Sequence, residues 1–435
     1  MPSIQRPRGT RDFGPEEMGR RRYIEGVMRK TAETFGFREI MTPTFEHSEL
    51  YTERSGEAIR NEMYTFKDKS DRELALRPEL TMPAIRFYAN ELTHMSKPIK
   101  IYYSTNCFRY ERPQSGRFRE FWQFGAETIG GGEYEADAEI IALAVECIRN
   151  SGLKDFKTRI GHLGVLRALL KDMDVDKENQ SKCMQLIDKG ELNELYNILG
   201  SIVQSEEKIE KIKAILDLEK SNTIPSKTRD IIAGCEEAIK AIEILERILT
   251  NLKALGVKEY TIDLGIARGL DYYTGMVFEI DVPFLGAEKQ VCGGGAYELA
   301  TLFDAKPTNS TGFAIGFDRV MMALEKKKTR IPVPTLVAYV IPMNENVKDE
   351  ALRITTNLRR NGISCDIILM DRSISKHMKH ANSLKAKYTI IIGEDEIKTR
   401  EASIKNMESG EQKKVVFDNI AKHLKESENT DIPRE

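Results

Sequence analysis

The sequence predicts three structural parts: a first part that mixes strands and helices, a helical segment set within it, and a C-terminal α/β domain. Three observations support this division. Strand-like and helix-like runs mix up to about residue 163, and Leu, Ile, Glu and Lys then recur at helical spacing over about 164–255. After residue 332, strand-like runs alternate with helical ones. The chain has 435 residues, enough for two or three domains with their own cores.

The first part begins with a helical pattern and continues with strand-like runs. Pro43 ends the first of these runs, because proline interrupts regular strand pairing. Two further runs are joined by a polar loop, and an amphipathic pattern follows them. The elements expected in chain order are a helix at 18–34, strands at 38–43, 100–108 and 118–129, a helix at 133–150, and strands at 260–263 and 276–282.

The helical segment and the C-terminal domain follow from the same patterns. Within 164–255, helices are expected at 207–218 and 230–255, where glycine and aromatic residues become scarce. The elements expected in the C-terminal domain are strand 336–341, helix 347–361, strand 364–369, helix 375–386, strand 388–392 and helix 418–426. The domain limits that we draw are 1–325 for the first domain, interrupted by 164–255, then 326–332 for a lysine- and proline-containing linker, 333–426 for the α/β domain and 427–435 for a polar tail.

The composition is that of a globular protein. Hydrophobic residues make up 40% and charged residues 31% of the chain. No apolar run reaches the ~18 residues that a membrane span needs, and the N-terminal charges are not followed by an apolar signal segment. The six cysteines lie far apart without a C-x-x-C pair, which argues against zinc or a disulfide framework. We therefore expect buried free thiols, a cytoplasmic location and no membrane partner.

Charge is distributed unevenly along the chain. The formal net charge is −2, which excludes a generally basic nucleic-acid coat. Residues 333–425 contain 16 Lys+Arg and 12 Asp+Glu and are therefore +4, which leaves −6 for the rest. An anionic partner would meet this C-terminal segment most favourably. A solvated charged face is the alternative explanation of the same excess.

The densest group of chemically informative residues spans 107–127. Four arginines stand there within eleven residues, interleaved with aromatic side chains, and they are Arg109, Arg112, Arg117 and Arg119. Guanidinium groups suit phosphate oxygens, and aromatic faces suit a purine ring. On antiparallel strands, alternate residues share a face, so Arg119, Phe121, Gln123, Gly125 and Glu127 would point the same way. A surface hairpin with solvated arginines is the alternative.

Three more clusters occur at 267–275, 292–298 and 312–319. The second holds three consecutive glycines, which either let a backbone approach a ligand closely or form a plain turn. In the third, Arg319 would stand in the first turn of a helix, where the macrodipole prefers an acid, so its position suggests a function. No G-x-x-x-x-G-K-[ST] or G-x-G-x-x-G pattern is present. His377 and His380 are interpreted as surface residues, and no metal site is expected.

At these clusters the chain resembles the class II aminoacyl-tRNA synthetases and, within them, the histidyl-tRNA synthetases. The segment ending at Pro43 is similar to motif 1 of that class, the segment 108–111 (Phe-Arg-Tyr-Glu) to motif 2, and the segment 316–319 (Gly-Phe-Asp-Arg) to motif 3. The run 268–273, Arg-Gly-Leu-Asp-Tyr-Tyr, matches a sharper signature of the histidine family. Segments 76–81 and 109–114 also match. The family usually has Arg-Tyr-Asp after the three glycines, whereas this chain has Ala296-Tyr297-Glu298.

The resemblance implies an α+β catalytic domain with an antiparallel sheet, an inserted helical domain and an α/β anticodon-binding domain. It implies that L-histidine is attached to tRNA-His in two steps, through a histidyl-adenylate formed from ATP. Mg²⁺ would accompany ATP, and the chain would form a homodimer. A noncatalytic synthetase-like regulatory or binding protein is the alternative from another class.

The resemblance also implies roles for individual residues. Those assigned to catalysis are Arg109, Arg268 and Gln123. Those assigned to ATP are Arg109, Arg117, Phe121 and Arg319. Those assigned to histidine are Glu79, Thr81, Gln123, Glu127, Arg268, Tyr272, Tyr273 and Tyr297. Arg112 and Gln114 are assigned to the tRNA acceptor end.

Overall fold

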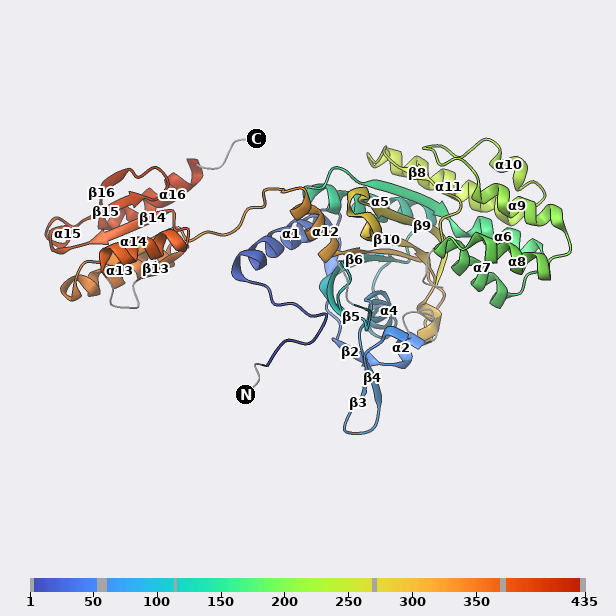
Figure 1. Ribbon diagram of the computed structural model, residues 1–435, viewed down its shortest axis with the longest axis horizontal. Helices are drawn as coiled ribbons and strands as arrows, with labels where there is room; N and C mark the ends of the chain where they lie inside the picture. The colour runs from blue at the N-terminus through green and yellow to red at the C-terminus, as the bar shows by residue number, and fades with distance from the viewer. Residues whose placement is uncertain (1–3, 53–60, 113–115, 268–271, 368–372, 431–435) are drawn as a thin grey trace. The chain divides into compact units, whose positions relative to one another are not determined.

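A computed structural model describes residues 4–52, 61–112, 116–267, 272–367 and 373–430. The chain divides into two compact units, Met1–Ile331 and Pro332–Glu435 (Figure 1). Each unit has a hydrophobic core of its own. The domain limits drawn from the sequence, including the separate helical domain at 164–255, remain predictions.

A large sheet forms the centre of the first unit. Its strands lie in the order β1-β5-β6-β11-β10-β9-β7-β8. Their bounds are β1 Arg38–Glu39, β5 Ile99–Phe108, β6 Glu120–Ile129, β7 Lys157–His162, β8 Thr261–Ile262, β9 Tyr273–Asp281, β10 Gln290–Tyr297 and β11 Ser310–Gly316. The six middle strands pair antiparallel, and only the edge strands β1 and β8 pair parallel with their neighbours. The predicted antiparallel sheet is confirmed.

Helices cover one face of this sheet (Figure 1). Helix α1 (Pro15–Thr34) packs against α5 (Glu133–Asn150), and α5 in turn packs on β11, β10 and β6. Ten side chains of α5 are buried, in keeping with its amphipathic sequence pattern. Helix α12 (Phe317–Lys326) follows β11 directly. The middle strands thereby gain a rigid backing, and their other face is available for a site.

The helical segment of the first unit is made of short helices and one long one. They are α6 Leu163–Asp172, α7 Lys177–Lys189, α8 Leu192–Ile202, α9 Glu206–Leu216, α10 Thr228–Ile231 and α11 Glu236–Ala254. A single helix was expected over 230–255, and that prediction is wrong. Helix α10 ends at Ile231, and Gly234, which has a left-handed φ of +86°, turns the chain before α11 begins.

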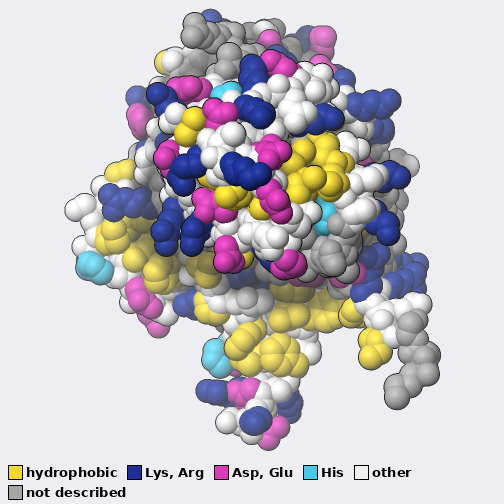
Figure 2. Space-filling model, turned by 90° about the vertical axis from the view of Figure 1, so that its left-hand side faces the viewer, with side chains coloured by type: hydrophobic (Ala, Val, Ile, Leu, Met, Phe, Trp, Pro, Cys, Tyr) yellow, Lys and Arg dark blue, Asp and Glu magenta, His cyan; other side chains and the backbone are white. Residues whose placement is uncertain are grey.

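A small three-stranded sheet projects from the first unit. Its strands are β2 Phe45–His47, β3 Thr65–Lys67 and β4 Glu73–Leu76, in the order β2-β4-β3. Phe45 and Phe66 pack edge to face and are 53% and 43% exposed. Figure 2 shows hydrophobic side chains above the charged tip of the projection. The chain then enters α4 (Thr81–Phe87) and the one-turn π-helix η1 (Tyr88–Leu92).

The second unit is an α/β domain around a five-stranded sheet of order β13-β12-β14-β15-β16. The strands are β12 Ala338–Pro342, β13 Cys365–Ile367, β14 Tyr388–Ile392, β15 Glu401–Asn406 and β16 Gln412–Val416. The helices are α13 Lys348–Arg360, α14 Ile374–Ser383, α15 Glu394–Thr399 and α16 Ile420–Thr430. Figure 2 shows many Lys and Arg side chains, with Asp and Glu between them, on one face of this unit. The predicted α/β alternation is confirmed, and β15 and β16 add an antiparallel hairpin to it.

Two sequence-based expectations about single residue types have opposite outcomes. All six cysteines are buried and free, as expected. The interpretation of His377 as a surface residue is wrong, because it is 3% exposed and its Nδ1 lies 3.3 Å from the hydroxyl of Tyr339.

Within the described ranges, no group of three or more potential ligands is placed to hold a metal ion. No helix there has both the length and the apolar composition of a membrane span.

Candidate functional site

A cavity of about 340 Å³ lies on the face of the large sheet opposite α5. Strands β6, β9, β10 and β11 and the starts of α4 and α12 contribute its walls. The predicted site residues that line it are Glu79, Thr81, Arg109, Arg117, Phe121, Gln123, Tyr272, Tyr273 and Arg319. Nine residues from segments far apart in the sequence therefore meet at one place.

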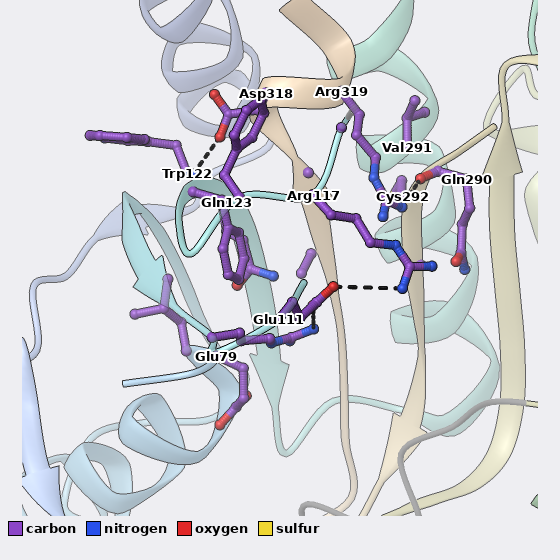
Figure 3. A pocket seen from close by; sticks show the side chains of 18 of the residues that line it. Glu79, Glu111, Arg117, Trp122, Gln123, Gln290, Val291, Cys292, Asp318 and Arg319 are labelled. Carbon is purple, nitrogen blue, oxygen red and sulfur yellow. Dashed lines mark hydrogen bonds and ion pairs between the residues drawn. The ribbon is translucent and has the colours of Figure 1, made fainter. Parts of the chain in front are cut away.

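Arginines occupy one side of the cavity (Figure 3). Arg117 and Arg319 both contact the carboxylate of Glu288. Nε of Arg117 lies 3.2 Å from one of its oxygens, and a terminal nitrogen of Arg319 lies 2.7 Å from the other. A terminal nitrogen of Arg319 also donates to the backbone oxygen of Gln290 at 2.7 Å. Burial lowers the pKa of Arg319, against the pull of Glu288. Two guanidinium groups thus converge on one anionic group, as they would on a phosphate.

The position of Arg319 is set by its neighbour in the first turn of α12. Asp318 is 4% exposed and accepts the backbone N–H of Trp122 at 2.8 Å. The same carboxylate accepts hydrogen bonds from Arg21 at 2.8 Å and pairs with Arg11 at 2.8 Å. Asp318 therefore fastens β6 to α12, and the acid that the macrodipole favours at this helix start is present beside Arg319.

Arg109 lines the cavity and is held by two neighbouring groups. Its Nε donates to the backbone oxygen of Pro78 at 3.0 Å. The guanidinium carbon lies 5.3 Å from the centroid of the Phe121 ring, within cation–π range. A terminal nitrogen lies 4.0 Å from a carboxylate oxygen of Glu111. The arrangement offers a positive group and an aromatic face side by side.

Glu79 lies at the opposite end of the cavity from Arg319 (Figure 3). Its carboxylate accepts the backbone N–H groups of Thr81 at 2.7 Å and Met82 at 3.1 Å, so it caps the start of α4. Burial raises the pKa of Glu79 to about 7, and the two backbone donors oppose that shift. The cap holds an acid at this end of the cavity, where the charge of Arg109 also lowers its pKa.

Glu127 lies behind the cavity wall and is 1% exposed. One carboxylate oxygen accepts the hydroxyls of Thr81 at 3.0 Å and Tyr103 at 2.8 Å, and the other accepts that of Tyr297 at 2.7 Å. Burial raises its pKa to about 7 despite these donors. A carboxylate has about four acceptor positions, so three donors leave roughly one for a further N–H group.

Glycines on β6 and β11 make room for this network. A Cβ at Gly312 would lie 1.5 Å from Oε2 of Glu127, and a Cβ at Gly125 would lie 2.4 Å from the Tyr103 ring. The three consecutive glycines belong to β10, so the plain turn considered for them is wrong. A Cβ at Gly294 would lie 2.3 Å from the backbone oxygen of Gly312. A Cβ at Gly295 would lie 2.4 Å from the backbone oxygen of Met276. Close strand packing requires glycine at these positions.

Three tyrosines form an aromatic group beside Glu127. The ring centroid of Tyr272 lies 4.7 Å from that of Tyr273 and 5.7 Å from that of Tyr297. Burial, with the neighbouring carboxylates, raises the pKa of Tyr272 and Tyr297 well above its usual value. Their hydroxyls therefore stay protonated at neutral pH and act as hydrogen-bond donors.

Three predicted site residues remain. Arg112 is exposed and does not line it. Arg268 and Gln114 lie outside the described residues. Arg119, expected on the same face as Phe121, instead stacks over Tyr110 at 3.9 Å from the ring centroid. It precedes β6, where the strict alternation of the strand has not begun.

The sequence reasoning missed two residues that contact the predicted ones. Tyr103 had a detectable signal, since it alternates with Ile101 and Thr105 in a strand-like run and pairs with Gly125 across β5 and β6. Glu288 ends the 3₁₀ helix η2 (Pro283–Glu288), far in sequence from both arginines that it contacts. No local pattern marks it.

The two departures from the family pattern have different surroundings. Glu298 is built into the local structure: its carboxylate accepts the Thr301 hydroxyl at 2.7 Å and the Thr308 backbone N–H at 3.3 Å. Ala296 borders a second, smaller cavity. The replacement of the family arginine by alanine therefore leaves space, whereas the replacement of aspartate by glutamate does not disrupt the loop.

Comparison with known proteins covers both units. A family model described as histidyl-tRNA synthetase matches residues 9–320, and one described as anticodon binding domain matches residues 337–427. The chain is 48% identical to the histidine–tRNA ligase of Archaeoglobus fulgidus, over 94% of this chain and 96% of that protein. It is 45% identical to that of Methanocaldococcus jannaschii, over 96% and 98%. The solved histidyl-tRNA synthetase of Nostoc sp. PCC 7120 superposes with a TM-score of 0.81 at 25% identity, over 98% and 99%.

Proposed function

The chain belongs to the histidyl-tRNA synthetase family, and from this membership we propose how its own residues attach histidine to tRNA-His. The function is ATP-dependent ligation of L-histidine to tRNA-His, as in curated relatives that match nearly the whole chain. The observation that carries the residue assignments is that one cavity has arginines on one side and the Glu79 carboxylate at the opposite end (Figure 3). ATP is an anion, and histidine carries an ammonium group.

The arginine-rich end is assigned to ATP. Phe121 would stack on adenine and Arg109 would hold the α-phosphate, because the two side chains lie against each other at the cavity wall. Arg117 and Arg319 would exchange Glu288 for the γ-phosphate end. By resemblance, Arg268 would touch the charge that develops between the histidine carboxylate and the α-phosphate.

The end that holds Glu79 is assigned to histidine. Glu79, Thr81 and Gln123 would bind the ammonium group, with the Glu79 carboxylate already held by the start of α4. Glu127 would accept one imidazole N–H at its remaining acceptor position, and Tyr273 would contact the other ring nitrogen. Tyr272 and Tyr297 would close the pocket around the ring. A pocket of this kind rejects analogues without ring nitrogens by roughly 10⁴, because its buried polar groups would be unpaired.

The first chemical step follows from this placement. A histidine carboxylate oxygen attacks the α-phosphorus, a new O–P bond forms, and pyrophosphate leaves with the electrons of the broken bond. The arginines neutralise charge on the transferred group, and positioning supplies most of the acceleration. In the second step, a terminal ribose hydroxyl of the tRNA attacks the acyl carbon and AMP leaves.

Mg²⁺ enters as part of the ATP substrate. It prefers oxygen ligands and is usually held by one or two carboxylates together with substrate phosphates. Glu111 and Glu279 line the cavity and offer such oxygens. The donor set therefore fits a substrate-borne ion, which would reduce repulsion between phosphates, and it does not form a metal cage within the described residues.

The second unit is assigned to tRNA and the projecting sheet to a homodimer. Residues 337–427 match an anticodon binding domain, and the +4 charge of 333–425 suits an anionic partner. Arg112 and Gln114 would reach the tRNA acceptor end.

The exposed side chains of Phe45 and Phe66 follow the motif 1-like segment, which in this class builds the dimer interface. Burial of this apolar surface would stabilise such a contact.

The experiment that tests the function is histidine-dependent exchange between pyrophosphate and ATP, followed by charging of tRNA-His with the same preparation. Both activities are expected. The noncatalytic regulatory alternative predicts neither, and the nearly full-length similarity to ligases disfavours it. Exchange supported equally by another amino acid would overturn the proposed specificity.

A further inference from the structure

A second cavity, of about 150 Å³, lies on the α5 side of the large sheet. We name it the back cavity, and the residues used below are Thr128, Asp137, His162, Gly275, Ala296 and Thr311. Thr128 directly follows Glu127 in β6, and Ala296 directly precedes Tyr297 in β10. Because successive strand residues point to opposite faces, the back cavity is separated from the candidate active site by the sheet.

The floor of the back cavity is a row of small residues across neighbouring strands. Thr311 pairs with Thr128 on one side and with Ala296 on the other. Gly275 continues the row, since a Cβ there would lie 3.2 Å from the Ala296 Cβ and 3.8 Å from Nε2 of His162. The space exists because alanine and glycine follow the two threonines in the row. The hydroxyl of Thr128 is buried without a hydrogen-bond partner among the described residues.

Asp137 is the buried one of the two acids that line the cavity. It stands on α5 and is 3% exposed. The groups that act on its carboxyl are the Thr311 hydroxyl and a like charge, Glu133, which also lines the cavity. Burial raises its pKa to about 7, and Glu133 adds to this shift. A buried carboxylate without a cation is unfavourable, so a cation entering the cavity would be stabilised there.

His162 does not supply that cation. Its Nδ1 accepts the Gly164 backbone N–H at 3.1 Å, so the proton of the neutral ring is on Nε2. Burial lowers the pKa of His162 to about 4, and the ring is neutral at physiological pH. The titratable residues of the cavity wall are therefore two acids, one neutral histidine and Tyr297, whose hydroxyl is turned to Glu127.

We propose that the back cavity is a binding site for a small planar cation of the guanidinium class. A guanidinium can give two parallel hydrogen bonds to the Asp137 carboxylate, and further N–H groups can reach the threonine hydroxyls. A cavity of about 150 Å³ accommodates a molecule the size of benzene, which is larger than methylguanidinium. Ala296 precedes Tyr297, so the occupant stabilises the strand that holds Glu127 through the Tyr297 hydroxyl.

The test is thermal unfolding of the full-length protein at pH 8 with saturating histidine, which keeps the active site filled. Methylguanidinium and its neutral counterpart methylurea are compared at 10 mM and equal ionic strength. Methylguanidinium is expected to raise Tm by roughly 2 °C and methylurea to leave it unchanged. An equal effect of the two compounds, or no shift with methylguanidinium, overturns the proposal.

Variants locate the effect in the back cavity. Asp137→Asn removes the charge at nearly constant shape and should abolish the shift. Glu146→Gln, on the same helix but paired with Arg149 outside the cavity, should retain it. If Asp137→Asn does not fold, Ala296→Met, which fills the cavity without adding charge, must abolish the shift instead. A shift that persists in either cavity variant overturns the proposal, and Ala296→Arg is expected to raise Tm without any added cation.

Discussion

The guanidinium of Arg109 is held by Pro78 and Phe121, and neither contact neutralises its charge. We therefore predict that Arg109→Ala lowers histidine-dependent pyrophosphate exchange by about 10² or more, the effect of losing one preorganised charge-stabilising donor. Arg119→Ala is the matched control, because Arg119 belongs to the same hairpin but stacks on Tyr110 outside the cavity. Equal losses in the two folded variants would contradict the assignment of Arg109 to the α-phosphate.

The substitution Glu127→Gln should increase the stability of the folded protein at pH 8 and weaken its use of histidine. Its folded-state pKa is about 7, above the ordinary 4.5, so the protonated carboxyl is favoured in the folded protein. The stability that this gives is present below about pH 4.5 and is lost as pH rises through about 7. Glu127→Gln should therefore be more stable than wild type at pH 8, by up to about 3 kcal/mol, and similar to it at pH 5.

The measurement is urea unfolding of both proteins at pH 5 and 8, combined with the KM values for histidine and ATP at pH 8. The histidine KM should rise at least tenfold in Glu127→Gln, and the ATP KM should change little. A variant that is less stable at pH 8 would show that the three hydroxyl donors outweigh burial. Equal changes in both KM values would argue against a role for Glu127 in reading the imidazole.

Individual residues were predictable where a family signature or an alternating strand marked them. Arg109, Phe121 and Gln123 line one cavity, and the same-face argument along β6 holds for the last two. Glu288 was not predictable, because its relation to Arg117 and Arg319 depends on the tertiary fold. The same limit applies to the burial of His377, whose lysine-rich helix indicated only a solvated face.

Strands β6 and β11 depend on glycine where they carry the Glu127 network. We predict that Gly312→Ala reduces histidine-dependent exchange at least tenfold, because the new Cβ would lie 1.5 Å from the Glu127 carboxylate. Gly200→Ala in α8 is the control: no atom lies within 4 Å of a Cβ there, and alanine should stabilise the helix by up to about 1 kcal/mol. Exchange rates and melting temperatures of both variants check this. Normal exchange in Gly312→Ala would show that the carboxylate can move without loss of function.

Secondary structure was predictable where periodicity was strong and unpredictable where glycine or charge obscured it. Helix α5 begins and ends where its amphipathic pattern does. The glycines of β10 resembled a turn because the sequence does not reveal the close neighbouring strands that exclude side chains. Strands β15 and β16 were missed, since the latter is largely exposed and rich in lysine, and half-exposed antiparallel strands have little apolar signal.

The molecule's two units have separate cores, and the adenylation residues assigned above all lie in the first. The second unit carries the +4 excess and the match to an anticodon binding domain. From the sequence, we predict a linker at 326–332 because of its lysines and prolines, and a separate domain after it because α/β alternation returns. The sequence could not show how one unit is oriented toward the other, because no local pattern encodes that relation.

A chain ending at Ile331 should therefore form histidyl-adenylate and charge tRNA poorly. Pyrophosphate exchange should remain within a few-fold of the full-length value, since the cavity is built from the first unit alone. Charging should fall because phosphate and base contacts from the second unit are lost. Binding of tRNA by the full-length chain should weaken as salt increases, and tRNA binding by the truncated chain should depend less steeply on salt.

Both activities are measured on one preparation whose cooperative unfolding is verified. Unimpaired charging would show that the second unit does not read the tRNA, and loss of exchange in a folded truncation would show that adenylation needs both units.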